Sequence, residues 1–183
     1  ISEDTELFSD TDGNNVETVR LPHSVAVTPF NCFDESSYQM LSLYEKTVVI
    51  PEGWRGKRVR ITFEGVAHEA TLYLNKDKLT THRCGYTAFT IDLTDKLLYG
   101  APNRISVRVD SNETLNQPPF GFVIDYMTYG GIYREVHIDV REKSYISDVY
   151  ASAGMDGNVR VKTEIEGEGE LFAKITDAKN GET

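Results

Sequence analysis

The strongest constraint on the fold of this chain is a series of short runs in which apolar and polar residues alternate. In 58–63 and 104–109, every second residue is apolar and the residues between are polar or charged. This period of two is typical of a strand in a sheet that has one face in water. The clearest strands are predicted at 44–50, 57–63, 71–75, 89–93 and 103–110.

Turn residues separate these runs, and helical periodicity is almost absent. Turns are predicted at Pro51-Glu52-Gly53, at 75–78 and at 100–103. One short helical turn is expected at 95–98, with Thr94 as its N-cap. Strands at this spacing predict an all-β fold, either a β-sandwich or a barrel.

A pair of adjacent glycines, Gly130 and Gly131, introduces the last of the well-patterned strands. Glycine can adopt positive φ and lets another segment approach closely. From Val136 the sequence alternates again as far as Val140. We therefore expect a half-buried strand that is entered through a tight glycine corner.

The composition changes after Val140. A polar connector at 141–144 is followed by three strand-like runs, at 146–153, 158–165 and 170–176. Three strands bury little by themselves, and an immunoglobulin-like sandwich needs ~7 strands and ~100 residues. Our preferred interpretation is that the chain stops inside a second domain, and the alternative is that these strands complete the first sandwich.

Composition and charge exclude several classes of function. The 183 residues are 39% hydrophobic, and the formal net charge is −10. Such a charge repels phosphate backbones and anionic membranes, so we expect no nucleic-acid and no membrane partner. No apolar run approaches the ~20 residues of a membrane span, and the first residues resemble no signal peptide. We therefore leave two locations open for the protein to which this chain belongs: the bacterial cytoplasm, or the periplasm or exterior if a signal was removed.

Cysteine and histidine usage predicts neither a metal nor a cofactor. Cys32 and Cys84 are the only cysteines, and their spacing fits no metal site. The four histidines also lack the spacing of ligands. We interpret both cysteines as buried or half-buried thiols.

Several short motifs occur in an order that resembles the amino-terminal domain of family-two glycoside hydrolases, the group of β-galactosidases, β-glucuronidases and β-mannosidases. These motifs are Leu21-Pro22-His23, Phe63-Glu64-Gly65-Val66, Tyr73-Leu74-Asn75, Gly85-Tyr86-Thr87-Ala88-Phe89, Asn103-Arg104-Ile105-Ser106-Val107 and the closing Gly130-Gly131-Ile132-Tyr133-Arg134. The resemblance implies a jelly-roll sugar-binding domain over 1–141 and the truncated start of an immunoglobulin-like β-sandwich over 142–183. Asn75-Lys76 stands where the family usually has Asn-Gly, which suggests a looser hairpin.

The resemblance also implies a multidomain enzyme whose chemistry lies elsewhere. Retaining glycoside hydrolysis uses two carboxyl groups ~5–5.5 Å apart, which this family carries on a TIM barrel of ~250 residues. No glutamate here stands in a recognisable catalytic context. We therefore expect no catalytic residue in this chain and no activity from it alone. The implied partners are a carbohydrate, bound through the parent active site, and the parent's own barrel, and a homo-oligomer is left open.

One substrate contact is implied inside the first domain. In β-galactosidases and β-glucuronidases, an Asp six residues before the Gly-Ile of the closing motif contacts the sugar, and this position is Asp125. A carboxylate can accept hydrogen bonds from two neighbouring hydroxyls, and aromatic neighbours suit the face of a pyranose. Without the resemblance, we would favour a carboxylate that braces its own loop.

Two further residues are candidates on the long loop before the first core strand. The family places a substrate-contacting Asn a few residues before that strand, and the matching position here is Gln39, with Asn31 earlier on the same loop. The predicted function is that of a non-catalytic amino-terminal part of a β-glycosidase. The alternative is a free-standing carbohydrate-binding or adhesion module that shares only the sandwich fold.

Overall fold

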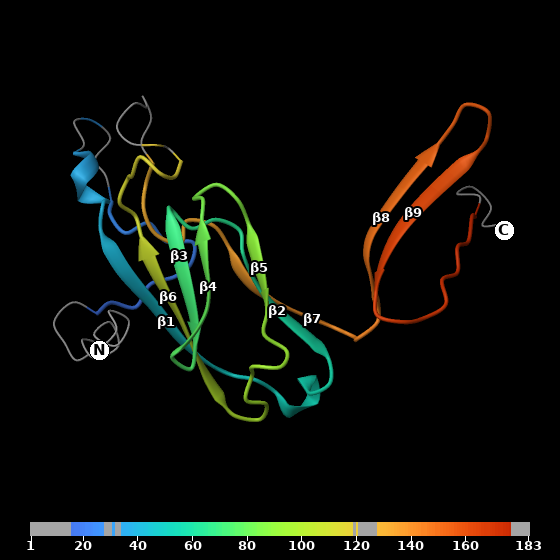
Figure 1. Ribbon diagram of the computed structural model, residues 1–183, viewed down its shortest axis with the longest axis horizontal. Coiled ribbons are helices and arrows are strands. Elements are labelled where there is room, and N and C mark those ends of the chain that lie inside the picture. The colour runs from blue at the N-terminus through green and yellow to red at the C-terminus, as the bar shows by residue number, and fades with distance from the viewer. Residues whose placement is uncertain (1–15, 28–30, 32–33, 119, 121–127, 177–183) are drawn as a thin grey trace. The chain divides into compact units, whose positions relative to one another are not determined.

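The computed structural model describes residues 16–27, 31, 34–118, 120 and 128–176 (Figure 1). In these residues the chain is almost entirely β, as the alternating runs predict, with two single-turn 3-10 helices, η1 (Glu35–Ser37) and η2 (Glu52–Trp54). The strands are β1 (Leu41–Val49), β2 (Arg58–Phe63), β3 (Glu69–Leu74), β4 (Asp77–Arg83), β5 (Phe89–Asp92), β6 (Pro102–Asp110), β7 (Val136–Arg141), β8 (Tyr145–Ala153) and β9 (Val159–Glu166).

Strands β1 to β7 form two sheets that pack as a sandwich. One sheet has the order β1-β6-β3-β4 and the other β5-β2-β7. The alternation of β2 places Val59, Ile61 and Phe63 in the core between the sheets. Inward-facing residues of β3 and β6, among them Leu72 and Val107, complete the same core. The predicted β-sandwich is confirmed.

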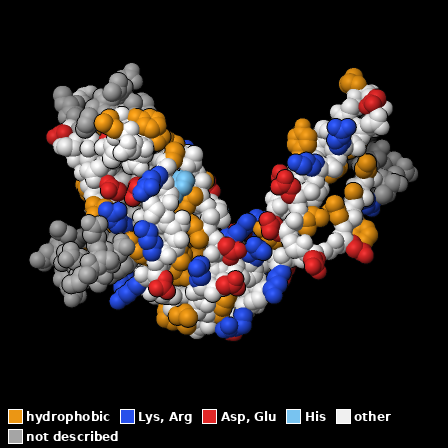
Figure 2. All heavy atoms as spheres, in the orientation of Figure 1, with side chains coloured by type: hydrophobic (Ala, Val, Ile, Leu, Met, Phe, Trp, Pro, Cys, Tyr) orange, Lys and Arg blue, Asp and Glu red, His pale blue; other side chains and the backbone are white. Residues whose placement is uncertain are grey.

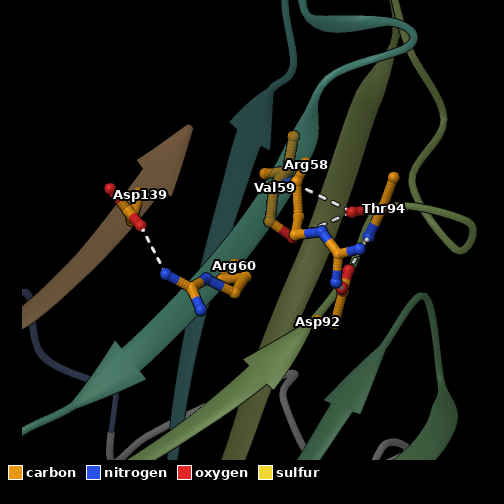
Figure 3. A network of polar contacts seen from close by, with 6 residues as sticks. All are labelled: Arg58, Val59, Arg60, Asp92, Thr94 and Asp139. Atoms are coloured by element: carbon orange, nitrogen blue, oxygen red, sulfur yellow. Dashed lines mark hydrogen bonds and ion pairs between the residues drawn. The ribbon is translucent and has the colours of Figure 1, made fainter. Parts of the chain in front are cut away.

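The outward-facing residues of β2 form polar pairs with both neighbouring strands (Figure 3). Arg58 lies 3.2 Å from the Asp92 carboxylate on β5, and Arg60 lies 3.0 Å from the Asp139 carboxylate on β7. The Val59 amide donates to Thr94 Oγ1 at 2.9 Å. The polar face of β2 is thus matched by its neighbours, which explains the one-sided pattern of this strand.

Three local expectations were wrong. Residues 95–98 form no helix, since only a turn at 94–96 is present, and the Thr94 hydroxyl is bonded to β2 instead of capping a helix. Asn75-Lys76 makes a tight two-residue hairpin, because both residues adopt positive φ and Leu74 pairs directly with Asp77. Residues 170–176 form no strand, since no other described strand pairs with them.

The contacts divide the chain into two units, Ile1–Val140 and Arg141–Thr183. In the second unit, β8 and β9 form a two-stranded hairpin with one apolar face and one charged face. The apolar face carries Ile146, Val149, Ala151, Ala153, Val159, Val161 and Ile165, and hydrophobic side chains lie exposed on this hairpin (Figure 2). No helix among the described residues is long and apolar enough to cross a membrane.

Candidate functional site

The glycine corner before β7 lies at the end of the sandwich where β2 leads into β3. Gly131 has φ +103° and pairs with Ala67, whose amide donates to the Gly131 carbonyl at 3.0 Å. A Cβ on Gly131 would lie 2.6 Å from the Tyr44 hydroxyl, and one on Gly130 would lie 2.6 Å from Ser111 Oγ. Both positions therefore require glycine, for the close approach that the sequence indicated.

The segment before η1 and β1 runs alongside this corner. The His23 amide donates to the Ile132 carbonyl at 2.7 Å, and the Val25 amide donates to the Gly130 carbonyl at 3.0 Å. His23 Nδ1 lies 2.9 Å from the Tyr44 hydroxyl. The corner is consequently enclosed by backbone on both sides.

A group of polar side chains lies beneath the corner, all of them buried except the half-buried Glu113, and we call it the closing cluster. Its members are Tyr38, His68, Ser111, Glu113 and Thr128. Ser111 Oγ donates to the Ala67 carbonyl at 2.8 Å and accepts from the Gly131 amide at 3.2 Å. Thr128 Oγ1 donates to Glu113 Oε1 at 2.8 Å, and the Tyr38 hydroxyl lies 3.5 Å from the same oxygen. The cluster thus ties the end of β6 to the glycine corner.

His68 is a deeply buried titratable member of the cluster, with 1% of its surface exposed. Neither ring nitrogen has a hydrogen-bond partner among the described residues. Burial lowers the pKa of His68, and this effect outweighs the negative charges of Glu113 and Asp110, which raise it. His68 is accordingly a neutral imidazole at pH 7.

The closing cluster marks the two ends of an excursion of the chain. Ser111 and Glu113 stand where β6 ends, and Thr128 and Gly131 stand where the chain returns. The two ends of this segment are therefore held at one place, although 14 residues separate Glu113 from Thr128. Apolar side chains are exposed beside these ends, at Leu115, Phe120 and Tyr129.

The three sugar-contact candidates predicted from the sequence differ in where they lie relative to this cluster. Asp125 lies outside the described residues, three positions before Thr128. Gln39 is half-buried. Both of its neighbours contact the end of β6: the Met40 carbonyl accepts from the Ser111 amide at 3.0 Å, and the Tyr38 hydroxyl lies 3.5 Å from Glu113 Oε1. Asn31 is exposed at a bend, between residues that lie outside the described ones.

Sequence reasoning did not find the closing cluster. Glu113 belongs to none of the motifs named in the sequence analysis, and His68 is one of the four histidines that lack the spacing of ligands. One signal in the sequence could have indicated this cluster. Polar residues directly follow the alternating run of β6, and such residues lie where a strand reaches the end of its sheet. Among the described residues, no three His, Cys, Asp or Glu side chains are grouped to hold a metal.

Comparison with known proteins covers most of the first unit. The model of the glycosyl hydrolases family 2, sugar binding domain, matches residues 17–141. A β-galactosidase from Thermoanaerobacter pseudethanolicus is 42% identical over 142 residues, which are 77% of this chain and 19% of that protein. A β-glucuronidase from Bacteroides fragilis is 40% identical over 113 residues, which are 61% of this chain and 16% of that protein.

A solved structure shares the fold as well. The β-glucuronidase of an uncultured Clostridium species superimposes with a TM-score of 0.70 and 25% identity, over 89% of this chain and 30% of that one. The chain thus spans about a fifth of the curated relatives and under a third of this structure.

Proposed function

The chain belongs to the glycosyl hydrolases of family 2, and on that basis we propose that it forms the amino-terminal part of a β-glycosidase of the β-galactosidase or β-glucuronidase type. The observation that carries the proposal is the family match over 17–141, which ends at the strand that the glycine corner introduces. The cleaving carboxylates belong to a barrel outside this chain, and this part contributes a wall of the sugar pocket.

The proposed sugar contact is Asp125. Its carboxylate accepts hydrogen bonds from two hydroxyls of the bound sugar. The closing cluster supports this role, because it holds the excursion that contains Asp125 by both ends. A long loop that is held at its base is a common way to present a functional residue from a rigid scaffold.

Gln39 is proposed as a second and lesser contact. Its neighbours Tyr38 and Met40 touch the ends of the excursion, so the loop before β1 and the excursion come from the same end of the sandwich. Asn31 belongs to that loop by sequence and is kept as a weaker candidate. The second unit, from Arg141, is proposed to be the first part of an immunoglobulin-like domain.

The test compares the isolated chain with the full-length protein. We expect the full-length protein to hydrolyse aryl β-galactosides or β-glucuronides, and we expect no hydrolysis by residues 1–183. One wall of a pocket offers a few hydrogen bonds at ~0.5–1.5 kcal/mol each, which cannot offset the loss of freedom of a hydrated sugar. Titration calorimetry of the isolated chain should therefore give constants no tighter than millimolar. A micromolar constant would favour the free-standing binding module instead.

A further inference from the structure

The backbone around Gln39 is held on both sides, whereas its side chain is not. Tyr38, the residue before it, is fully buried, and the carbonyl of Met40, the residue after it, accepts from the Ser111 amide at 3.0 Å. Gln39 itself is half-buried, and no hydrogen bond joins its side-chain amide to another described residue. A rigid backbone that carries an unpaired amide is suited to presenting that amide to a ligand.

Gly130 is the residue on which this loop packs. A Cβ on Gly130 would lie 2.8 Å from the Tyr38 carbonyl oxygen, as well as 2.6 Å from Ser111 Oγ. Atoms in a close-packed interior do not approach one another so closely, so a side chain here would have to displace a neighbour. Gly130 is not among the glycines with positive φ, in contrast to Gly131. Close packing alone therefore accounts for glycine at this position.

The two neighbours of Gly130 differ in how firmly they are held. Ser111 Oγ donates to the Ala67 carbonyl at 2.8 Å and accepts from the Gly131 amide at 3.2 Å, so this side chain is fixed between two backbone segments. The Tyr38 carbonyl belongs to the loop before β1, and loops yield more readily than the ends of paired strands. A side chain on Gly130 should therefore displace that loop.

We propose that Gly130, backed by Ser111, is a positioning residue for Gln39. The inference rests on the proposed function, in which the Gln39 amide contacts the sugar. Gly130 is buried, so it affects the sugar only through the loop that packs on it. A Cβ here would have to lengthen the contact with Tyr38 from 2.8 Å to the 3.4 Å or more of an ordinary contact. A hydrogen bond spans only ~2.7–3.2 Å, so a shift of this size in the adjacent Gln39 weakens one.

The test uses the full-length protein and an aryl β-glycoside that it hydrolyses. Gln39→Ala removes the proposed contact and should lower kcat/KM about three- to tenfold, as the loss of one neutral hydrogen bond does. Gly130→Ala should lower kcat/KM by about the same factor. Gly53→Ala is the matched control, because Gly53 also lacks positive φ but has open space around it, and this variant should leave kcat/KM unchanged.

A double variant separates positioning from a general loss of stability. If Gly130 acts through Gln39, then Gly130→Ala should lower kcat/KM no further once Gln39 is replaced by alanine, within about 1.5-fold. Losses that multiply would overturn the inference, as would a Gly130→Ala enzyme equal to the Gly53→Ala control. Circular dichroism checks that each variant folds. If Gly130→Ala does not fold, Ser111→Ala takes its place, since it removes the hydroxyl that backs Gly130, and the same two outcomes decide.

The same set distinguishes this inference from the proposed function. If Gln39→Ala retains the parental kcat/KM, the proposed contact of Gln39 is wrong and the inference falls with it. If Gln39→Ala is slow while Gly130→Ala matches the Gly53→Ala control, the contact of Gln39 stands and only the positioning role is refuted.

Discussion

At the scale of single residues, Gly131 has to be glycine for two separate reasons: its backbone conformation and the close packing around it. Its φ of +103° is unfavourable for a side chain, and a Cβ would lie 2.6 Å from the Tyr44 hydroxyl. Gly56 has a similar φ of +85° but open space around it. We expect Gly56→Ala to lower the free energy of unfolding by ~1–2 kcal/mol through the backbone alone, and Gly131→Ala to lower it by at least ~2 kcal/mol more because of the clash. Urea denaturation of the two variants tests this, and equal losses would contradict the packing described for the corner.

His68 predicts a pH dependence of stability. Its pKa in the folded chain is lowered by burial from the ordinary 6.5, so the unfolded chain binds the proton more readily. Below pH 6.5 the unfolded state gains a proton that the folded state lacks. The free energy of unfolding therefore falls as the pH falls, by at most about 1.4 kcal/mol per pH unit for this group.

His68→Met removes the titrating group and replaces it with an apolar side chain of similar size. Denaturation of both proteins between pH 8 and pH 5 should show a smaller decline for the variant. Parallel curves would mean that His68 is charged, or exposed, in the folded protein.

Only part of the site could be predicted at this scale. Two adjacent glycines are conspicuous in a sequence, because few positions need them, and the tight corner was anticipated. The bond from Thr128 to Glu113 was not, since it joins positions 15 apart with no periodic relation. Hydrogen bonds of this kind depend on where the two ends of a long loop meet, and only the folded chain determines that.

At the scale of elements, the hairpin between β3 and β4 can be improved. Asn75 and Lys76 have φ of +52° and +78°, and the Asn75 side chain accepts from the Arg104 amide at 2.8 Å. Turns of this kind favour Asn-Gly, because glycine has no penalty at positive φ. We expect Lys76→Gly to raise the free energy of unfolding by ~0.5–1 kcal/mol.

Lys78→Gly is the matched control, because Lys78 lies on β4 and pairs with Tyr73. A glycine inside a strand should be destabilising by a similar amount. Thermal denaturation should move the two melting temperatures in opposite directions. A lower melting temperature for Lys76→Gly would show that the Lys76 side chain stabilises this hairpin.

The same hairpin shows which elements the alternation can reveal. β2 buries every second residue, β6 does the same with Ser106 buried in addition, and both strands were predicted closely. β4 was missed, since Asp77-Lys78-Leu79-Thr80-Thr81-His82-Arg83 has almost no apolar residue to alternate. It is an edge strand of its sheet, and polar side chains on an edge discourage pairing with other chains.

At the scale of the whole chain, the two units are expected to differ in protection. The apolar face of the β8–β9 hairpin is exposed, whereas Val59 and Phe63 of β2 are buried. Backbone hydrogen bonds under a buried core open rarely, and those of an uncovered hairpin open often. Hydrogen exchange of the isolated chain should therefore be faster in 159–165 and 171–175 than in 59–63. Equal protection would count against a second domain that needs further strands.

The central claim is that this chain supplies a sugar contact to a β-glycosidase, and kcat/KM of the full-length Asp125→Ala variant tests it most directly. Loss of a charge-assisted hydrogen bond of ~1.5–3 kcal/mol should lower kcat/KM roughly ten- to hundredfold. Asp125→Asn should lower kcat/KM by the same factor or by less. Asp77→Ala, at the start of β4 opposite Leu74, should leave kcat/KM unchanged. The melting temperature of Asp125→Ala should change little. A large fall in melting temperature with an unchanged kcat/KM would contradict the account, because Asp125 would then brace its loop and touch no sugar.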